Sequence, residues 1–254
     1  MWRFIAASVV GTSHLRSGQS CQDRVACEVL ADSTLIAATA DGAGSAIMAD
    51  KGAEIAVKTT IRFVSNALKN GRTDFALILL EAVMEARSNI LSSAYEQDLE
   101  PRDLASTILA IIAGHTGGAA IQIGDGVIVI GSIEELWRPV FWPQHGEFAN
   151  TTNFLTDEDA DVLIQVKLFE DNVTDIALTT DGLESLALTF SSKSVYKPFF
   201  DGIFEPLFQT SGKGEIIHLS KMLESFLSSD RIRARTDDDV SLILATCRSQ
   251  NFKP

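Results

Sequence analysis

The sequence predicts one domain that combines β-strands with amphipathic helices. Short apolar runs ending in glycines and acidic residues recur along the chain, as is typical of strands followed by tight turns. Two longer stretches, 45–69 and 74–91, instead repeat apolar residues every three or four positions, which is the helical period. No linker-like segment interrupts the 254 residues, so we expect residues 1–254 to form a single domain.

The composition excludes several classes of protein. Hydrophobic residues make up 46% of the chain and charged residues 22%, which is expected of a globular protein and not of a disordered one. The longest uncharged stretch, 104–123, is interrupted by glycines, so no transmembrane segment is predicted. Residues 1–10 are apolar but lack the features of a signal peptide, and we expect them to form the first strand.

The net charge and the cysteine spacing exclude further kinds of partner and site. A net charge of −13 argues against nucleic acid or an anionic membrane as partner, because both would be repelled. The three cysteines, Cys21, Cys27 and Cys247, show neither Cys-x-x-Cys spacing nor paired histidines, so neither a zinc site nor a disulfide framework is predicted. The expected compartment is therefore the cytoplasm.

Two strands and two helices are predicted in the first part of the chain. The strands are expected at 25–30 and 35–40, joined by a short polar turn. The first helix follows over 45–69 with Ser45 as its N-terminal cap, and the second begins at Asp74, another capping residue. Each helix has one apolar face, so both are expected to cover a sheet.

The middle of the chain is predicted to form a β-meander. Strands are expected at 106–113, 119–123 and 127–130, and glycine-containing turns separate them. The second turn, Gly-Asp-Gly at 124–126, has two interpretations. It is either only the hairpin turn of the meander, or its Asp125 is a functional residue.

The last part of the chain is again predicted to contain both strands and helices. Residues 162–169 and 173–180 are predicted to be a pair of strands, and 190–209 has aromatic residues at near-helical spacing that indicate a packing element. An amphipathic helix is expected at 216–228 and a final buried strand at 240–246.

The candidate functional residues are the acids at the ends of the apolar runs. Asp41, Asp125 and Asp181 each stand before a glycine where such a run ends, and Asp238 and Asp23 stand before the start of one. Ends of this kind can converge at one edge of a sheet structure. Gathered carboxylates repel one another and lose hydration, so they need protons or cations.

The residue types point to a hard divalent cation. Carboxylates without a neighbouring His or Cys favour magnesium or manganese, and Gly42 could turn its backbone carbonyl toward the same ligand. The polar loop expected at 11–20 holds His14 and Arg16, either of which could meet an anion bound by the metals or be an ordinary exposed side chain. No serine or cysteine nucleophile motif is found.

Six short motifs follow one another along the chain: Gln22-Asp23, Ala40-Asp41-Gly42-Ala43-Gly44-Ser45, Ser106-Thr107, Ile123-Gly124-Asp125, Thr180-Asp181-Gly182-Leu183 and Asp238-Asp239-Val240-Ser241. In this order they resemble the metal-dependent protein phosphatases of the PP2C class, particularly their divergent bacterial branch. The resemblance covers nearly the whole chain. It implies an α+β fold, a four-layer α-β-β-α sandwich of two mainly antiparallel sheets flanked by helices, with a two-metal site where the sheets meet at one end.

The resemblance also implies a role for each acid. Asp41 would bridge two manganese or magnesium ions, and Gly42 would offer its carbonyl. Asp181 and Asp238 would hold one ion, and Asp23 would face the other.

Three departures from the family pattern stand out. The early phosphate-binding arginine of the family has no counterpart at its usual spacing, so His14 or Arg16 would have to substitute for it. Ala43 stands where some members carry a candidate general-acid histidine. Asp125 resembles a ligand of a looser third metal, but Ser185 occupies the place where many members supply a further aspartate for that ion, which leaves its occupancy open.

By resemblance, the expected activity is hydrolysis of phosphoserine and phosphothreonine in proteins, opposite a serine/threonine kinase. Two cations about 3.5–4 Å apart would activate a bridging hydroxide that attacks phosphorus in line. The alternative is a catalytically weak or inactive phosphatase-like regulator that binds metal and a phosphorylated partner. Ala43, Ser185 and the missing arginine favour the regulator, whereas the intact set of acids favours the enzyme. In a third interpretation, the acids only form turns of an α/β scaffold.

Overall fold

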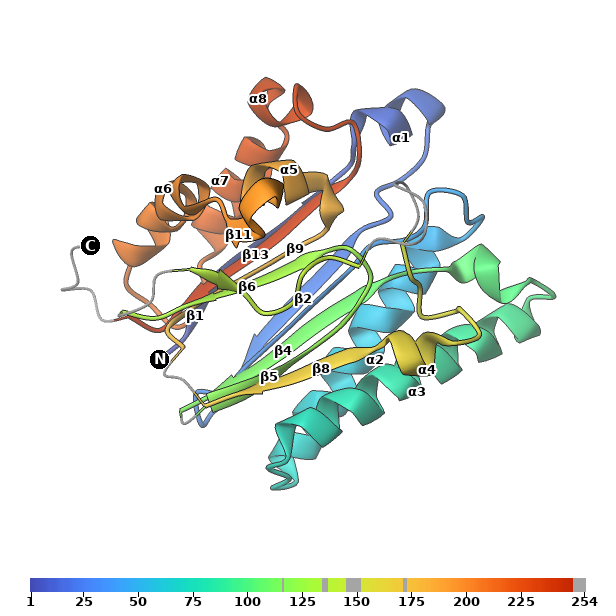
Figure 1. The fold of residues 1–254 in the computed structure, drawn as a ribbon, viewed down its shortest axis with the longest axis horizontal. Helices are drawn as coiled ribbons and strands as arrows, with labels where there is room; N and C mark the ends of the chain where they lie inside the picture. Colours follow the sequence, from blue (N-terminus) through green and yellow to red (C-terminus); the bar gives the residue numbers. More distant parts are fainter. Residues whose placement is uncertain (116, 134–136, 145–151, 171–172, 249–254) are drawn as a thin grey trace.

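Two β-sheets lie face to face at the centre of the structure, and helices cover both outer faces (Figure 1). The computed structural model describes residues 1–115, 117–133, 137–144, 152–170 and 173–248. The four layers follow the order helices, sheet, sheet, helices. The predicted α+β sandwich of two mainly antiparallel sheets is therefore confirmed.

The first sheet has six strands in the order β12–β1–β13–β9–β6–β7, and only β12 runs parallel to its neighbour. Strands from the two ends of the chain pair along their full length, from Arg3 opposite Thr246 to Val9 opposite Val240. The strands are β1 (Arg3–Val9), β6 (Val127–Gly131), β7 (Arg138–Pro139), β9 (Asp175–Thr179), β12 (Gly214–Glu215) and β13 (Val240–Thr246).

The second sheet has five strands in the order β2–β3–β4–β5–β8, all antiparallel. Its strands are β2 (Arg24–Val29), β3 (Leu35–Ala40), β4 (Ile108–Gly114), β5 (Gly117–Ile123) and β8 (Gln165–Phe169). A separate two-stranded ribbon joins β10 (Leu188–Thr189) to β11 (Ser194–Val195).

Long helices cover each sheet. The five-stranded sheet packs against α2 (Ala49–Lys69) and α3 (Phe75–Glu96), and the six-stranded sheet against α6 (Lys197–Phe208) and α7 (Ile217–Leu227). Short helices are α1 (Thr12–Ser17), α4 (Ala160–Leu163), α5 (Glu184–Ala187) and α8 (Asp230–Arg233), with 3₁₀ turns at Pro101–Leu104, Asp181–Leu183 and Phe190–Ser192. No helix in the described ranges combines the length and apolar character that a bilayer span requires.

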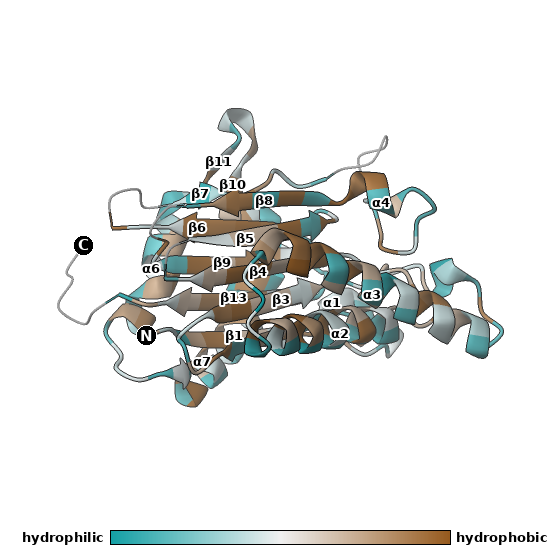
Figure 2. Cartoon of the chain, turned by 90° about the horizontal axis from the view of Figure 1, so that it is seen from below, coloured by the Kyte–Doolittle hydropathy of each residue, from teal (hydrophilic) through white to brown (hydrophobic). Residues whose placement is uncertain are grey.

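The core has three apolar layers because both sheets are covered on both faces. Along β3, Ile36 and Ala38 face the helices, whereas Leu35 and Ala37 face the other sheet. Side chains alternate between the faces of a strand, so a strand buried on both sides reads as a continuous apolar run. Figure 2 shows the strands of both sheets as predominantly hydrophobic, with hydrophilic residues concentrated on the helices and loops.

The predicted β-meander is wrong in its last step. Strands β4 and β5 form the expected hairpin, but β6 leaves this sheet and pairs with β9 and β7 in the other one. The Gly-Asp-Gly segment at 124–126 is therefore the crossover between the two sheets and not a hairpin turn. Gly124 has φ +118°, a conformation that residues with a side chain rarely adopt.

The predicted strand pair at 162–169 and 173–180 is also wrong. Both strands form, but β8 lies at the edge of the five-stranded sheet and β9 lies inside the six-stranded sheet. The pattern of apolar residues predicts a strand but not its partners, which are β5 for β8, and both β13 and β6 for β9.

Two local expectations near the N-terminus need correction. Residues 12–17, predicted as part of a polar loop, form helix α1, which docks through the Ser13 backbone N–H and hydroxyl on the Asp237 carbonyl. Helix α2 begins at Ala49 and not at Ser45, which does not cap it. The Asp74 cap is confirmed, because its carboxylate accepts the Leu77 N–H at 3.1 Å.

A buried ion pair joins β9 to the end of β13. The Arg248 guanidinium donates to the Asp175 carboxylate, with Nε 2.6 Å from Oδ2, and Thr246 and Thr174 hydroxyls donate to the same carboxylate at 2.7 and 2.8 Å. Asp175 is fully buried. Burial raises its pKa, while the hydrogen bonds and the charge of Arg248 act to lower it.

We expect Arg248→Met to lower the free energy of unfolding by about 3–5 kcal/mol, because it leaves a buried carboxylate without its charge partner. Thr174→Val removes one hydrogen bond to the same carboxylate and should cost only about 1 kcal/mol. Urea denaturation of both variants tests this. A loss below 1 kcal/mol for Arg248→Met would contradict the assigned importance of the pair.

Candidate metal centre

The predicted acids gather where the two sheets end on the same side. In the five-stranded sheet, Ala40 pairs with Arg24, so Asp41 at the end of β3 lies beside Asp23 at the start of β2. In the six-stranded sheet, Thr179 pairs with Leu242, which brings the end of β9 beside the start of β13. The ends of four strands, from two sheets, thus deliver carboxylates to one place.

Three of these acids form the centre of the cluster. Asp41, Asp125 and Asp181 each offer a carboxylate oxygen, and the three oxygens lie within 4.8 Å of one another. Asp41 and Asp125 come from the five-stranded sheet, and Asp181 comes from the six-stranded sheet. The cluster therefore depends on the packing of the two sheets against each other.

Asp23 is a buried neighbour of this group. It is 1% exposed, and its Oδ2 accepts a hydrogen bond from the Thr180 hydroxyl at 2.7 Å. Burial raises its pKa to about 7, against the lowering effect of the hydrogen bond from Thr180. Burial is also the main reason why the pKa of Asp41 is well above its ordinary value, and the charges of Asp23, Asp181 and Asp238 raise it further.

The remaining acids of the cluster have raised pKa values for the same reasons. Burial raises the pKa of Asp181 to about 8, helped by the negative charges of its acidic neighbours. Burial likewise raises the pKa of Asp238. Carboxylates in such surroundings ionise at neutral pH only when positive charge compensates them.

The donor set fits divalent cations. Oδ1 of Asp23 and Oδ1 of Asp181 are buried and have no hydrogen-bond partner among the described residues. An ionised carboxylate oxygen can only accept, so each of these buried atoms lacks a positive or donating neighbour. Asp41, Asp125 and Asp181 offer hard oxygen ligands, which magnesium and manganese prefer.

Residues 106 and 107 hold the backbone of the central aspartate. The Asp41 N–H donates to the Thr107 hydroxyl at 2.9 Å, and the Thr107 N–H donates to the Asp41 carbonyl at 2.8 Å. Gly42 forms an isolated antiparallel β-bridge with Ser106. A Cβ on Gly42 would lie 2.5 Å from the Ala49 carbonyl oxygen. Only glycine therefore lets the chain pass so close to the start of α2.

Asp239 is a site residue that the sequence did not distinguish from Asp238. Its carboxylate is 1% exposed and accepts the backbone N–H groups of Gly11 at 2.6 Å and Gln22 at 2.5 Å. The same carboxylate lies 3.0 Å from His14 Nδ1. Asp238 in turn accepts the Asp239 N–H at 2.8 Å. Asp239 therefore ties three segments around the cluster.

The two candidates for anion binding are in different surroundings. His14 is 8% exposed, packs against Asp239, and its charge lowers the pKa of the predicted ligand Asp238. The Arg16 side chain is 71% exposed, and its guanidinium lies 3.3 Å from the equally exposed Asp237 carboxylate. The structure thus brings His14, and not Arg16, to the buried acids.

Ser185 and its neighbour complete the description of the cluster. Ser185 is exposed, and its neutral hydroxyl brings no negative charge to a metal ion. The adjacent Glu184, which the sequence analysis did not single out, lies close enough for its charge to raise the pKa of Asp181. In the sequence, the one signal for Glu184 is its position two residues after the Asp181-Gly182 pair.

Comparisons with known proteins agree with this geometry. A family model described as Protein phosphatase 2C matches residues 10–228. The chain is 34% identical, over 249 residues, to Serine/threonine-protein phosphatase 3 of Escherichia coli (strain K12), which covers 96% of this chain and 98% of that protein.

Solved structures show the same fold at low identity. One is the catalytic domain of the serine/threonine protein phosphatase PstP in complex with two manganese ions, with 19% identity, a TM-score of 0.64 and coverage of 96% of this chain and 97% of that one. Another is the phosphatase Stp1 from Staphylococcus aureus, with 13% identity, a TM-score of 0.63 and coverage of 98% and 96%. By family model, sequence relative and fold, the chain belongs to the protein phosphatase 2C family.

Proposed function

We propose that residues 1–254 act as one metal-dependent phosphatase domain that hydrolyses phosphoserine and phosphothreonine in proteins, opposite a serine/threonine kinase. The observation that carries this proposal is the convergence of Asp41, Asp125 and Asp181 within 4.8 Å. Family membership and the E. coli relative named as a serine/threonine-protein phosphatase support the substrate class.

The acids supply the ligands of the proposed reaction. Asp41 is close enough to Asp23, Asp181 and Asp238 for their charges to raise its pKa, which makes it the candidate for a ligand shared by both cations, with the Gly42 carbonyl beside it. Asp181 and Asp238 would hold one manganese or magnesium ion, and Asp23 would face the other ion. Two bound cations would activate a water molecule as nucleophile and neutralise charge on the phosphoryl group.

His14 is the proposed contact to the substrate. Asp239 lies 3.0 Å from Nδ1 in an ion-pair contact, which leaves Nε2 as the nitrogen available to a substrate oxygen. In that position His14 could bind the phosphate or donate a proton to the leaving serine or threonine oxygen. The exposure of Arg16 supports its assignment as an ordinary surface residue.

The first prediction concerns turnover. Manganese should activate phosphate release from a phosphothreonine peptide, and Asp41→Asn should lower kcat by about 100-fold or more, because it removes a charge shared by the whole cluster. Asp161→Asn, which changes an exposed carboxylate outside the site, is the matched control and should leave kcat unchanged.

The same titration separates the enzyme from the alternative. If calorimetry shows manganese binding but no concentration of manganese yields phosphate release, the enzyme proposal is overturned and the phosphatase-like regulator is supported. If neither binding nor turnover is seen, the metal site itself is overturned.

The second prediction separates His14 from Arg16. His14→Ala should lower kcat/KM by about 100-fold, whereas Arg16→Ala should change it less than about twofold because its charge is exposed and screened. If His14 protonates the leaving group, His14→Ala should lower kcat/KM more for a phosphothreonine peptide than for p-nitrophenyl phosphate, whose leaving group needs no proton. A larger effect from Arg16→Ala would contradict the assignment of His14.

The third prediction concerns the stability of the metal-free protein. Folding raises the pKa of Asp23 to about 7 and of Asp181 to about 8, so the folded state holds protons that the unfolded chain releases near pH 4. The stability due to this proton binding is complete below the unfolded pKa and is lost as the pH rises through 7 and 8. The melting temperature in EDTA should therefore fall between about pH 5 and pH 8.

Manganese should reverse that trend, because cations bind the ionised carboxylates. The rise in melting temperature on adding manganese should grow with pH, and Asp181→Asn should weaken both effects. A metal-free melting temperature that stays level or rises over this pH range would show that the acids are not buried as described.

A further inference from the structure

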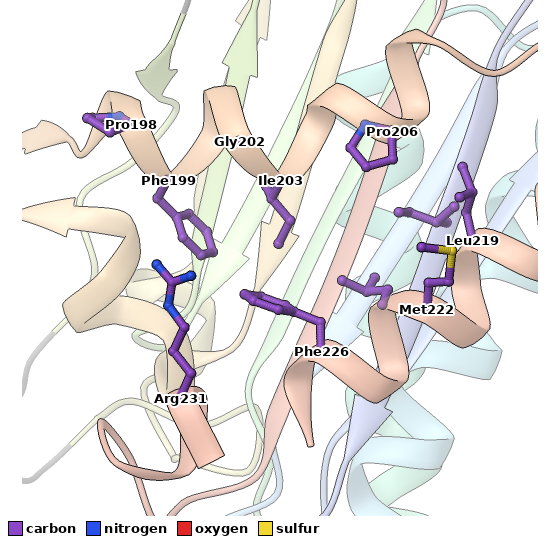
Figure 3. Close-up of a pocket in the computed structure, with 11 residues that line it drawn as sticks. Pro198, Phe199, Gly202, Ile203, Pro206, Leu219, Met222, Phe226 and Arg231 are labelled. Atoms are coloured by element: carbon purple, nitrogen blue, oxygen red, sulfur yellow. The ribbon is translucent and has the colours of Figure 1, made fainter. Parts of the chain in front are cut away.

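An apolar cavity of about 370 Å³ opens on the outer side of the six-stranded sheet, between α6 and α7 (Figure 3). It is separate from the acid cluster, which lies at the edge where the two sheets meet. Its volume falls within the range of small-molecule sites, roughly 300–1,000 Å³. The residues around it are Ile5, Pro198, Phe199, Gly202, Ile203, Pro206, Leu219, Met222, Leu223, Phe226 and Arg231.

The sequence of α6 leaves this space empty. Gly202 and Pro206 lie on the side of α6 that borders the cavity, and neither brings a long side chain to fill it. A Cβ built on Gly202 would meet no atom within 4 Å. Below them, Leu219 and Leu223 of α7 are buried and form an apolar floor.

One cation borders the cavity. The Arg231 side chain extends from α8 toward Phe199, beside the ring of Phe226 (Figure 3). Within the described part of the chain, no carboxylate forms an ion pair with Arg231, whereas Lys197 at the start of α6 is paired with Asp201. A guanidinium beside an apolar opening is suited to a planar carboxylate, which it binds through two parallel hydrogen bonds.

We propose that this cavity binds a small amphiphile, an unbranched apolar chain that ends in a carboxylate, such as a medium-chain fatty acid. The apolar chain would lie between α6 and α7, and the carboxylate would pair with Arg231. A single guanidinium compensates a single negative charge, and the net charge of −13 disfavours ligands with more. The proposal is independent of the phosphatase activity.

Calorimetry with three probes of equal chain length tests the charge preference. Decanoate, decanol and decyltrimethylammonium are titrated into the full chain below their micelle-forming concentrations. Decanoate should bind one per chain, about fivefold more tightly than decanol, as expected for a partly exposed ion pair. Decyltrimethylammonium should bind more weakly than either, because Arg231 repels it.

Two variants assign the binding to this cavity. Arg231→Gln should weaken decanoate about fivefold and leave decanol unchanged, while Arg233→Gln, on the same helix but outside the cavity, should change neither. Gly202→Phe should abolish binding of both probes by filling the space, and Gly202→Ala controls for the loss of the glycine. Thermal denaturation checks that each variant is folded.

Three results would overturn the proposal. They are equal affinity of the wild-type chain for decanoate and decanol, undiminished binding by folded Gly202→Phe, and no binding of any probe. The last of these would instead favour an apolar segment of a protein as the occupant. Because Arg231→Gln changes an exposed side chain, its effect can be read even if Gly202→Phe does not fold.

Discussion

Mutual repulsion among buried carboxylates is the constraint on which the site depends. Asp23, Asp41 and Asp181 are drawn from two sheets into a region with little water, where burial and neighbouring charges raise each pKa. The favourable packing of three apolar layers holds the sheets together and so keeps the acids close. Folding thus produces a site whose charge requires cations.

Backbone hydrogen bonds make that arrangement rigid. Thr107 binds both the N–H and the carbonyl of Asp41, and Asp239 binds the N–H groups of Gly11 and Gln22. These contacts connect residues that are 66 to 228 positions apart in sequence. Ligands fixed by such partners keep their geometry without relying on the metal. Asp239 thereby connects the segments of Gly11 and Gln22 to the start of β13.

The two helical layers differ in the side chains that they turn toward their sheets. Helices α2 and α3 face their sheet with many alanines, including Ala53, Ala56 and Ala82, and pack closely against it. The layer of α6 and α7 is richer in aromatic residues, and its buried Phe200 and Phe204 leave the surface near Gly202 unfilled. The cavity beside Gly202 therefore lies in the aromatic layer of α6 and α7.

The sequence by itself determined the long helices, most strands and the acids at the strand ends, because each depends on a local pattern of apolar, glycine and capping residues. Only the tertiary structure decided that 124–126 crosses between sheets, that β8 and β9 join different sheets, and that His14 and Asp239 meet beside the acids. Strand partners and side-chain contacts across more than 200 residues depend on the packing of the whole chain, for which no local period carries a signal. The cavity beside Arg231 likewise exists only once α6, α7 and α8 have packed on β1.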